Sequence, residues 1–336
     1  DQDQAIRKAH KDFLTPLQRA SELAKKLQKK RIKRGAIRFS IPAAAISLNL
    51  DNTVNSITRT QTHFAHQIIE EFMLAANEAV ANTFVESGRK TLFRIHERPD
   101  QDKVSEFAKF AATLGFTLLQ TGENSLWYND VIDNAAGTTH EYIINNLLLR
   151  TMQQARYSSD NSGHFGLATD NYLHFTSPIR RYPDLVVHRQ ICTLLDGLPT
   201  SGQTPNAPIP LNEAGQALSS KERTAISAER DMVDRLKRQF MSTQIGKTFA
   251  AVISGVTETS LYVELLETFI SGIIKLSSMS DDYYLFDEKR YRVVGDISGS
   301  TFQIGDPLHV ELIDVDNQSN KIFFKRVEVR TEQKSS

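Results

Sequence analysis

Hydrophobic positions in the first 240 residues recur at three- and four-residue intervals, a spacing that predicts amphipathic helices. Helices are expected over residues 5–34, 62–87, 99–115, 141–155 and 211–242. The stretch from Ala36 to Ser40 alternates as a strand does, and residues 200–210, rich in proline and small polar residues, predict a loop. The first part of the chain is therefore expected to combine many helices with few strands.

The pattern changes after Gly246 to short runs with a period of two, which is typical of strands. Five strands are predicted, over residues 249–254, 261–265, 272–276, 307–314 and 321–326, with turn signals between them. Five short strands of this kind fit an all-β barrel of the OB type. We therefore predict an α+β fold, with a mixed domain over residues 1–243, the barrel over 244–329 and a disordered tail over 330–336.

The composition is ordinary for a soluble globular protein and does not indicate a binding partner. The chain of 336 residues is 40% hydrophobic, and 40 basic residues balance 40 acidic ones, so net charge does not point to nucleic acid. No apolar run is long enough to span a membrane, and the single cysteine, Cys192, cannot form an internal disulfide. A cytoplasmic protein is expected, with Cys192 buried in an apolar stretch.

The end of the first predicted helix, Lys25 to Arg34, holds seven basic residues and no acidic one. Such a run is usually a solvated helix face, but it also suits contact with phosphates. Gly35 is expected to end this helix.

The densest cluster of polar and aromatic residues lies between His164 and Arg189. Thr176 and Ser177 precede Pro178, a residue common at the first helical position, so we expect a helix to begin there and to present free N–H groups to an anion. Arg180 and Arg181 would then oppose the helix dipole unless an anion neutralises them. Asp184 could be that anion for Arg181, and a ligand phosphate is the alternative.

Three histidines in this region, His164, His174 and His188, do not have the spacing of a zinc site, and no cysteine pair accompanies them. They are interpreted as structural or RNA-contacting residues. Tyr172 is expected to be either a core residue or a base-stacking one.

The run from His164 to Arg189 resembles the signature of the ribonuclease II and ribonuclease R family of processive 3′→5′ exoribonucleases, the RNB type. Other segments resemble family motifs in the expected order. These are Arg34–Phe39, Ile69–Asn77, Arg94–Pro99 and Ala228–Asp231, while the tail around Asp282–Asp287 is more similar to ribonuclease R. The resemblance covers nearly the whole chain and implies hydrolysis of single-stranded RNA to nucleoside monophosphates.

The resemblance also implies roles for individual residues. Arg180 would contact the phosphate near the scissile bond, and Glu229 would act near the catalytic centre. Phe39 would stack on terminal bases, and Glu70 or Glu71 would lie near the end of the RNA channel. The remaining expected RNA contacts in this part are Asn77, Tyr172, Ser177 and Arg181.

OB barrels bind single strands through a basic groove and exposed aromatic rings, for which Lys247, Tyr262 and Lys275 are the candidates. Phe249 is expected to be a core residue. Related barrels usually have an aromatic–glycine pair where this chain has Thr259–Ser260. Because a stacked ring contributes about 1–3 kcal/mol per base, weaker RNA binding is expected here.

The family resemblance implies magnesium, which carboxylate clusters bind. In the family such an aspartate cluster precedes the strand that Arg34–Phe39 resembles, but here the preceding residues offer only Asp1, Asp3 and Asp12. Metal ligands are therefore not expected in this chain. It is either the C-terminal part of an exoribonuclease, as its start at Asp1 suggests, or a non-catalytic RNA-binding relative. The missing segment could also be a separate partner chain.

Overall fold

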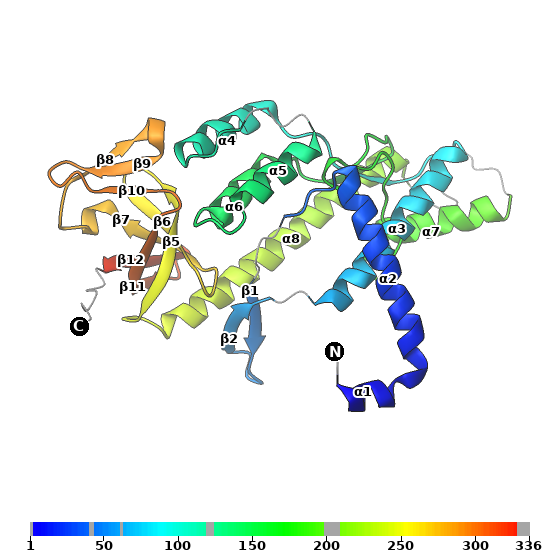
Figure 1. The fold of residues 1–336 in the computed structure, drawn as a ribbon, viewed down its shortest axis with the longest axis horizontal. Helices are drawn as coiled ribbons and strands as arrows, with labels where there is room; N and C mark the ends of the chain where they lie inside the picture. Colours follow the sequence, from blue (N-terminus) through cyan, green and yellow to red (C-terminus); the bar gives the residue numbers. More distant parts are fainter. Residues whose placement is uncertain (1–2, 40–43, 61–62, 119–123, 198–208, 328–336) are drawn as a thin grey trace.

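The computed structural model describes residues 3–39, 44–60, 63–118, 124–197 and 209–327. A long helix, α8, runs diagonally through the molecule and leads into a β-barrel at one end, while the other helices lie beside and beyond it (Figure 1). The expected α+β fold, with a barrel after a mixed region, is confirmed.

The mixed region contains eight α-helices and two short two-stranded sheets within the described residues. In chain order they are α1 (Gln4–Ala9), α2 (Lys11–Arg34), β1 (Ala44–Leu48), β2 (Val54–Arg59), α3 (Phe64–Glu86), β3 (Phe93–Ile95), α4 (Gln101–Thr113), α5 (Ser125–Ala135), α6 (Glu141–Thr151), β4 (Arg156–Ser158), α7 (Tyr182–Leu195) and α8 (Leu211–Ser242). β1 pairs with β2, and β3 pairs with β4, both antiparallel.

The helix boundaries follow from local capping. Asp100 accepts the backbone N–H of Asp102 and so begins α4, as its place after Pro99 predicted. Gly35 ends α2 in a left-handed conformation, with φ of 103°, and its N–H bonds to the Ile32 carbonyl. A Cβ atom at Gly35 would lie 2.8 Å from Ser125 Oγ, so the close approach of α5 also requires glycine there.

α8 packs closely on the small sheet of β3 and β4 near its own N-terminal end. Gly215 faces the backbone of Tyr157 in β4, and a Cβ atom there would lie 2.9 Å from the Tyr157 carbonyl oxygen. Ser219, one turn later, accepts the Tyr157 N–H at 2.9 Å. This contact fixes the start of α8 against the region that holds the predicted site.

The last part of the chain is a closed five-stranded barrel with the strand order β11-β12-β7-β6-β5. Its strands are β5 (Thr248–Val256), β6 (Ser260–Leu265), β7 (Ser271–Lys275), β11 (Pro307–Asp316) and β12 (Lys321–Val327). All five match predicted strands. A three-stranded sheet inserted between β7 and β11, consisting of β8 (Tyr284–Asp287), β9 (Arg292–Gly295) and β10 (Thr301–Gln303), was not predicted.

The barrel core extends into the preceding region. Met241 of α8 is fully buried among barrel residues, and Ile57 of β2 packs against the same cluster. Tyr142 of α6 donates a hydrogen bond to Glu264 of β6, and its ring lies 6.3 Å from the ring of Phe269. The helical part and the barrel therefore share packed and polar contacts.

Several sequence expectations are corrected by the structure. Ala36–Phe39 is not a strand, because the Ile37 and Arg38 N–H groups bond to the Gly166 carbonyl and the Asn129 side chain instead of a neighbouring strand. The predicted first helix is interrupted at His10. The hairpin β1–β2 and helix α5 were not anticipated. The predicted loop lies mostly, and the predicted tail wholly, outside the described residues.

The expectation that Cys192 is buried is wrong, because Cys192 is exposed on α7. The neighbouring Thr193 is buried on the same helix, so the apolar sequence around Cys192 did not determine its burial. No helix in the described part of the chain is long and apolar enough to cross a membrane.

Candidate RNA-binding site

The loop between β4 and α7 is built on a row of contacting rings. Tyr172 lies edge-on between His164 and His174, with ring centroids 5.3 and 5.8 Å away. His174 shares a hydrogen bond of 2.8 Å with the Tyr157 hydroxyl, and His164 Nδ1 accepts the Leu167 N–H. Burial lowers the pKa of His164 to about 3 and that of His174 to about 2. Both rings are therefore neutral near pH 7 and their hydrogen bonds lie within the protein, while RNA contact by these histidines stays a prediction.

Asn77 on α3 attaches this loop to the helix. Its side chain is 2% exposed, its Nδ2 donates to the Tyr172 hydroxyl at 3.1 Å, and its Oδ1 accepts the Phe175 N–H at 2.9 Å. Tyr172 is itself buried. Both residues therefore support the loop.

The turn that carries the two arginines is organised by Asp184. This fully buried carboxylate accepts the Ser177 N–H at 2.8 Å and the Arg181 Nη2 at 2.7 Å. The internal interpretation of Arg181 is thus correct. The Ser177 backbone carbonyl in turn accepts the N–H groups of Arg180 and Arg181.

The expected helix start at Pro178 is wrong. Residues 178–180 form a turn, Arg181 is the N-cap residue, and α7 begins at Tyr182 with Pro183 in its first turn. The physical reason is that Asp184 binds the Ser177 N–H, which closes the turn before the helix starts. Arg180 therefore lies on an exposed turn rather than within a helix.

The two adjacent glutamates of α3 have different environments. Glu71 is 4% exposed and receives two hydrogen bonds from the Nε and Nη2 of Arg31 at the end of α2, the shorter at 2.6 Å. Arg34 similarly pairs with Glu78. Two cations of the basic run thus hold α2 against α3, while Glu70 is exposed and unpaired among the described residues.

A pocket of about 460 Å³ lies where α3 meets this loop. Four residues that the sequence predicted as RNA contacts, Glu70, Asn77, Tyr172 and Arg181, line it together. Its other walls are a stripe of α3, Ala65, His66, Ile69, Met73 and Leu74. The periodicity predicted an amphipathic helix here, and the structure leaves Ile69 on its apolar face 58% exposed.

Arg94 and Glu222 form an ion pair of 2.6 Å that sequence reasoning missed, and it joins β3 to α8. The Arg94 guanidinium also lies 4.6 Å from the centre of the Tyr157 ring. Glu229 is exposed on the same helix, about 10 Å further along at 1.5 Å per residue. Arg180 and Glu229 are both exposed, and neither has an ion-pair partner in the part of the chain that the structure describes.

Phe39 is half-buried against the cluster formed by α4, α5 and α6. Its neighbour Arg38 pairs with Asp133 of α5 at 2.8 Å. The role of Phe39 in stacking stays a prediction, and its packing limits the ring face that bases could reach.

The barrel presents a small aromatic and basic face on β6 and β7. Tyr262 is 41% exposed and pairs in register with Ile273, while Lys275 lies 4.8 Å above the Phe323 ring. Phe249 packs against the barrel core, as expected. Lys247 is exposed just before β5.

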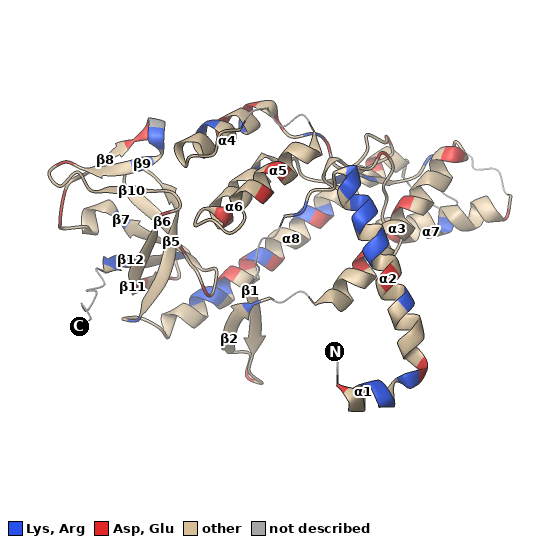
Figure 2. Cartoon of the chain, in the orientation of Figure 1, with Lys and Arg blue, Asp and Glu red and all other residues tan. Residues whose placement is uncertain are grey.

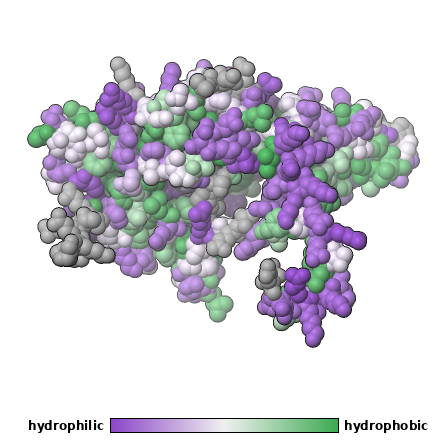
Figure 3. Space-filling view, viewed as in Figure 1, coloured by the Kyte–Doolittle hydropathy of each residue, from purple (hydrophilic) through white to green (hydrophobic). Residues whose placement is uncertain are grey.

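Charges are distributed unevenly over the molecule. Basic residues gather on the last turns of α2 and near the barrel end of α8, where acidic residues also occur (Figure 2). The surface over α1 and α2 is strongly hydrophilic (Figure 3).

Within the described residues, no three histidine, cysteine, aspartate or glutamate side chains come close enough to hold a metal ion. Asp3 is used to cap α1.

Residues 2–197 match the RNB domain family, and residues 242–326 match the S1 RNA binding domain family. Ribonuclease R of Aquifex aeolicus is 37% identical over 327 residues, which are 97% of this chain and 46% of that protein. Ribonuclease R of Escherichia coli is 38% identical over 336 residues, covering 97% of this chain and 41% of the relative.

A solved structure of Mycoplasma genitalium RNase R in complex with ribose methylated single-stranded RNA has the same fold, with a TM-score of 0.86 and 28% identity. The match covers 93% of this chain and 49% of that one. The chain thus spans less than half the length of these relatives. From the family match, the S1 match and the shared fold, we conclude that the chain belongs to the RNB-domain exoribonuclease family and is similar to ribonuclease R.

Proposed function

We propose that this chain is the RNA-holding part of a ribonuclease R-like 3′→5′ exoribonuclease that hydrolyses single-stranded RNA to nucleoside monophosphates. The observation that carries the proposal is the pocket between α3 and the β4–α7 loop. It gathers Glu70, Asn77, Tyr172 and Arg181, which lie up to 111 positions apart in the sequence and were all expected to contact RNA.

The pocket and its rim suit a terminal nucleotide. The aliphatic side chains of Ile69 and Met73 can pack against a base. Glu70 is an acceptor for ribose hydroxyls, and the 2′-hydroxyl is the group that distinguishes RNA from DNA. Arg180, on the turn that Asp184 holds, is free to form a bidentate contact with a phosphate.

Magnesium is the metal that the family resemblance implies, but the described residues do not fit a magnesium site, because no carboxylate cluster is formed among them. We therefore propose that the metal ligands of the complete enzyme lie outside this chain. Glu229 is proposed to act near the catalytic centre from its exposed position on α8. The chain alone is expected to bind RNA without degrading it.

The test is to measure RNA binding and RNA degradation with the same purified chain. A labelled oligouridylate should bind, and no nucleotide should be released in magnesium. Arg180→Ala should weaken binding and reduce the slope of log Kd against log salt by about 0.7, the value for one phosphate contact on a single strand. Arg59→Ala, which removes an exposed arginine from β2, is the matched control.

The outcomes separate the alternatives. Rapid magnesium-dependent hydrolysis by this chain would contradict the proposed division of the active site. An unchanged salt slope for Arg180→Ala would remove Arg180 from the phosphate contacts. The alternative function, a non-catalytic RNA-binding protein, would be favoured if the complete natural protein bound RNA tightly and released no nucleotides.

A further inference from the structure

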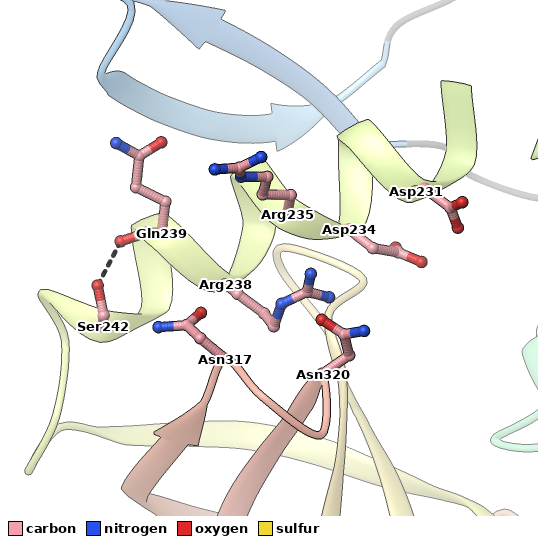
Figure 4. Close-up of a pocket in the computed structure, with 8 residues that line it drawn as sticks. All are labelled: Asp231, Asp234, Arg235, Arg238, Gln239, Ser242, Asn317 and Asn320. Atoms are coloured by element: carbon pink, nitrogen blue, oxygen red, sulfur yellow. Dashed lines mark hydrogen bonds between the residues drawn. The ribbon is translucent and has the colours of Figure 1, made fainter. Parts of the chain in front are cut away.

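A pocket of about 950 Å³ lies at the junction of α8 and the barrel, away from the site above. One wall is formed by the last three turns of α8, and the other by the turn that joins β11 to β12 (Figure 4). This junction pocket has a volume within the range of about 300–1,000 Å³ that is typical of ligand sites.

The cations of the junction pocket lack partners. Arg235 and Arg238 both line it, and neither has an ion-pair partner among the described residues. The Nε of Arg238 is buried and has no hydrogen-bond acceptor. By contrast, the neighbouring Lys237 is held by the Phe269 carbonyl at 3.1 Å. A buried guanidinium nitrogen without an acceptor is unfavourable, and an anionic oxygen would satisfy it.

The remaining polar groups are suited to the other parts of a nucleotide. Arg238 extends between Asn317 and Asn320 of the barrel turn, while Asp231 and Asp234 lie at one end of the pocket (Figure 4). Carboxylates accept hydrogen bonds from ribose hydroxyls and base amino groups, and amides can both donate and accept. The two carboxylates also make the pocket unsuitable for a densely charged anion such as a polyphosphate.

The position of the pocket in the barrel supports a nucleic-acid ligand. Asn317 and Asn320 belong to the loop between the fourth and fifth barrel strands, a loop with which OB barrels bind oligonucleotides. A smaller pocket of about 220 Å³ adjoins this one, shares Asp234, Arg238 and Asn320, and reaches Ser271 at the start of β7. A polar path therefore continues from the helix onto the barrel.

We propose that the junction pocket binds a nucleotide within a single-stranded RNA chain, with Arg235 and Arg238 on the phosphodiester. This proposal rests on the proposed RNA-binding function. Arg238 lies 16 positions after Glu222, which is about 24 Å along the helix. At about 3.4 Å per stacked nucleotide, one strand would need about seven nucleotides to extend from the region of Glu222 to the junction pocket.

The experiment compares wild type with Arg235→Gln/Arg238→Gln, using fluorescence anisotropy of an oligouridylate of about twenty nucleotides, long enough for that span. The double variant should bind about tenfold more weakly near 0.1 M salt and lose about 1.4 from the salt slope, about 0.7 for each phosphate contact. The control is Lys103→Gln/Lys109→Gln, which removes the same charge from exposed positions of α4.

The outcomes are distinguishable. If wild type does not bind RNA, the proposed function fails. If wild type binds and the double variant behaves as the α4 control does, only the junction pocket is refuted. If the double variant does not fold, Asn317→Asp, which adds a negative charge at the exposed turn, should weaken binding, and unchanged binding overturns the proposal. Uridine monophosphate binding as tightly as the oligonucleotide would also overturn it, since the ligand would then be a free nucleotide.

Discussion

Replacement of Asp184 by alanine tests how the turn that carries Arg180 is held. The wild-type carboxylate is fully buried, accepts Ser177 N–H and pairs with Arg181, whose side chain is 18% exposed. Alanine removes the partner of a mostly buried cation and leaves the Ser177 N–H without its acceptor. Breaking a buried ion pair in this way costs about 3–5 kcal/mol. Because Arg181 keeps some exposure to water, we expect about 3 kcal/mol, the lower end of that range.

Asp184→Asn separates the charge from the hydrogen bond. An asparagine oxygen can still accept the Ser177 N–H, but a neutral acceptor contributes about 1 kcal/mol, against about 1.5–3 kcal/mol for a charged one. The expected loss is therefore smaller than for alanine, about 1–2 kcal/mol. Asp196→Ala, an exposed acid at the end of the same helix, should change stability by less than about 0.5 kcal/mol.

Urea unfolding followed by tryptophan fluorescence is the suitable assay. The only tryptophan, Trp127, is buried in α5 and so reports the helical part rather than the barrel. The shift in midpoint multiplied by the m-value gives the change in the free energy of unfolding. A loss below about 1 kcal/mol for Asp184→Ala, or equal losses for alanine and asparagine, would refute the view that this ion pair holds the turn.

Gly215→Ala should destabilise the chain by about 1–3 kcal/mol, because the new methyl group clashes with the Tyr157 carbonyl and this outweighs a gain of about 1 kcal/mol in helix propensity. The measurement is the melting temperature, and a higher value than that of the wild type would contradict the close packing of α8 on β4. Asn77→Ala leaves the Phe175 N–H and the Tyr172 hydroxyl unpaired, so the free energy of unfolding in urea should fall by at least about 2 kcal/mol. A decrease below about 0.5 kcal/mol would show that water replaces the amide. The pKa values of His164 and His174, about 3 and 2, lie below the unfolded value near 6.5. Their contribution is therefore complete above pH 6.5 and falls as the pH drops, by up to about 2.7 kcal/mol for each histidine at pH 4.5; equal stabilities at pH 7 and pH 4.5 would contradict buried neutral rings.

Local patterns determined the barrel strands and the long helices. The period of two in residues 248–327 and the turn residues between the runs identified all five barrel strands, because each strand has one face in the core. The 32-residue helix α8 was predicted over its full length. The family motifs between His164 and Arg189 were equally local, and they identified the loop that the structure places beside α3.

Where two positions in the sequence suit the same role equally well, only tertiary contacts decide which of them takes that role. Glu70 and Glu71 are neighbours with the same chemistry, and the pairing of Arg31 with Glu71 leaves Glu70 at the pocket. Pro178 and Pro183 both suit a helix start, and the bond from Ser177 to Asp184 selects the later one. Periodicity reveals that one face of a helix is apolar, but what covers that face depends on residues far away in the chain. For the same reason the junction pocket, formed by α8 and a turn about 80 residues later, could not be read from the sequence.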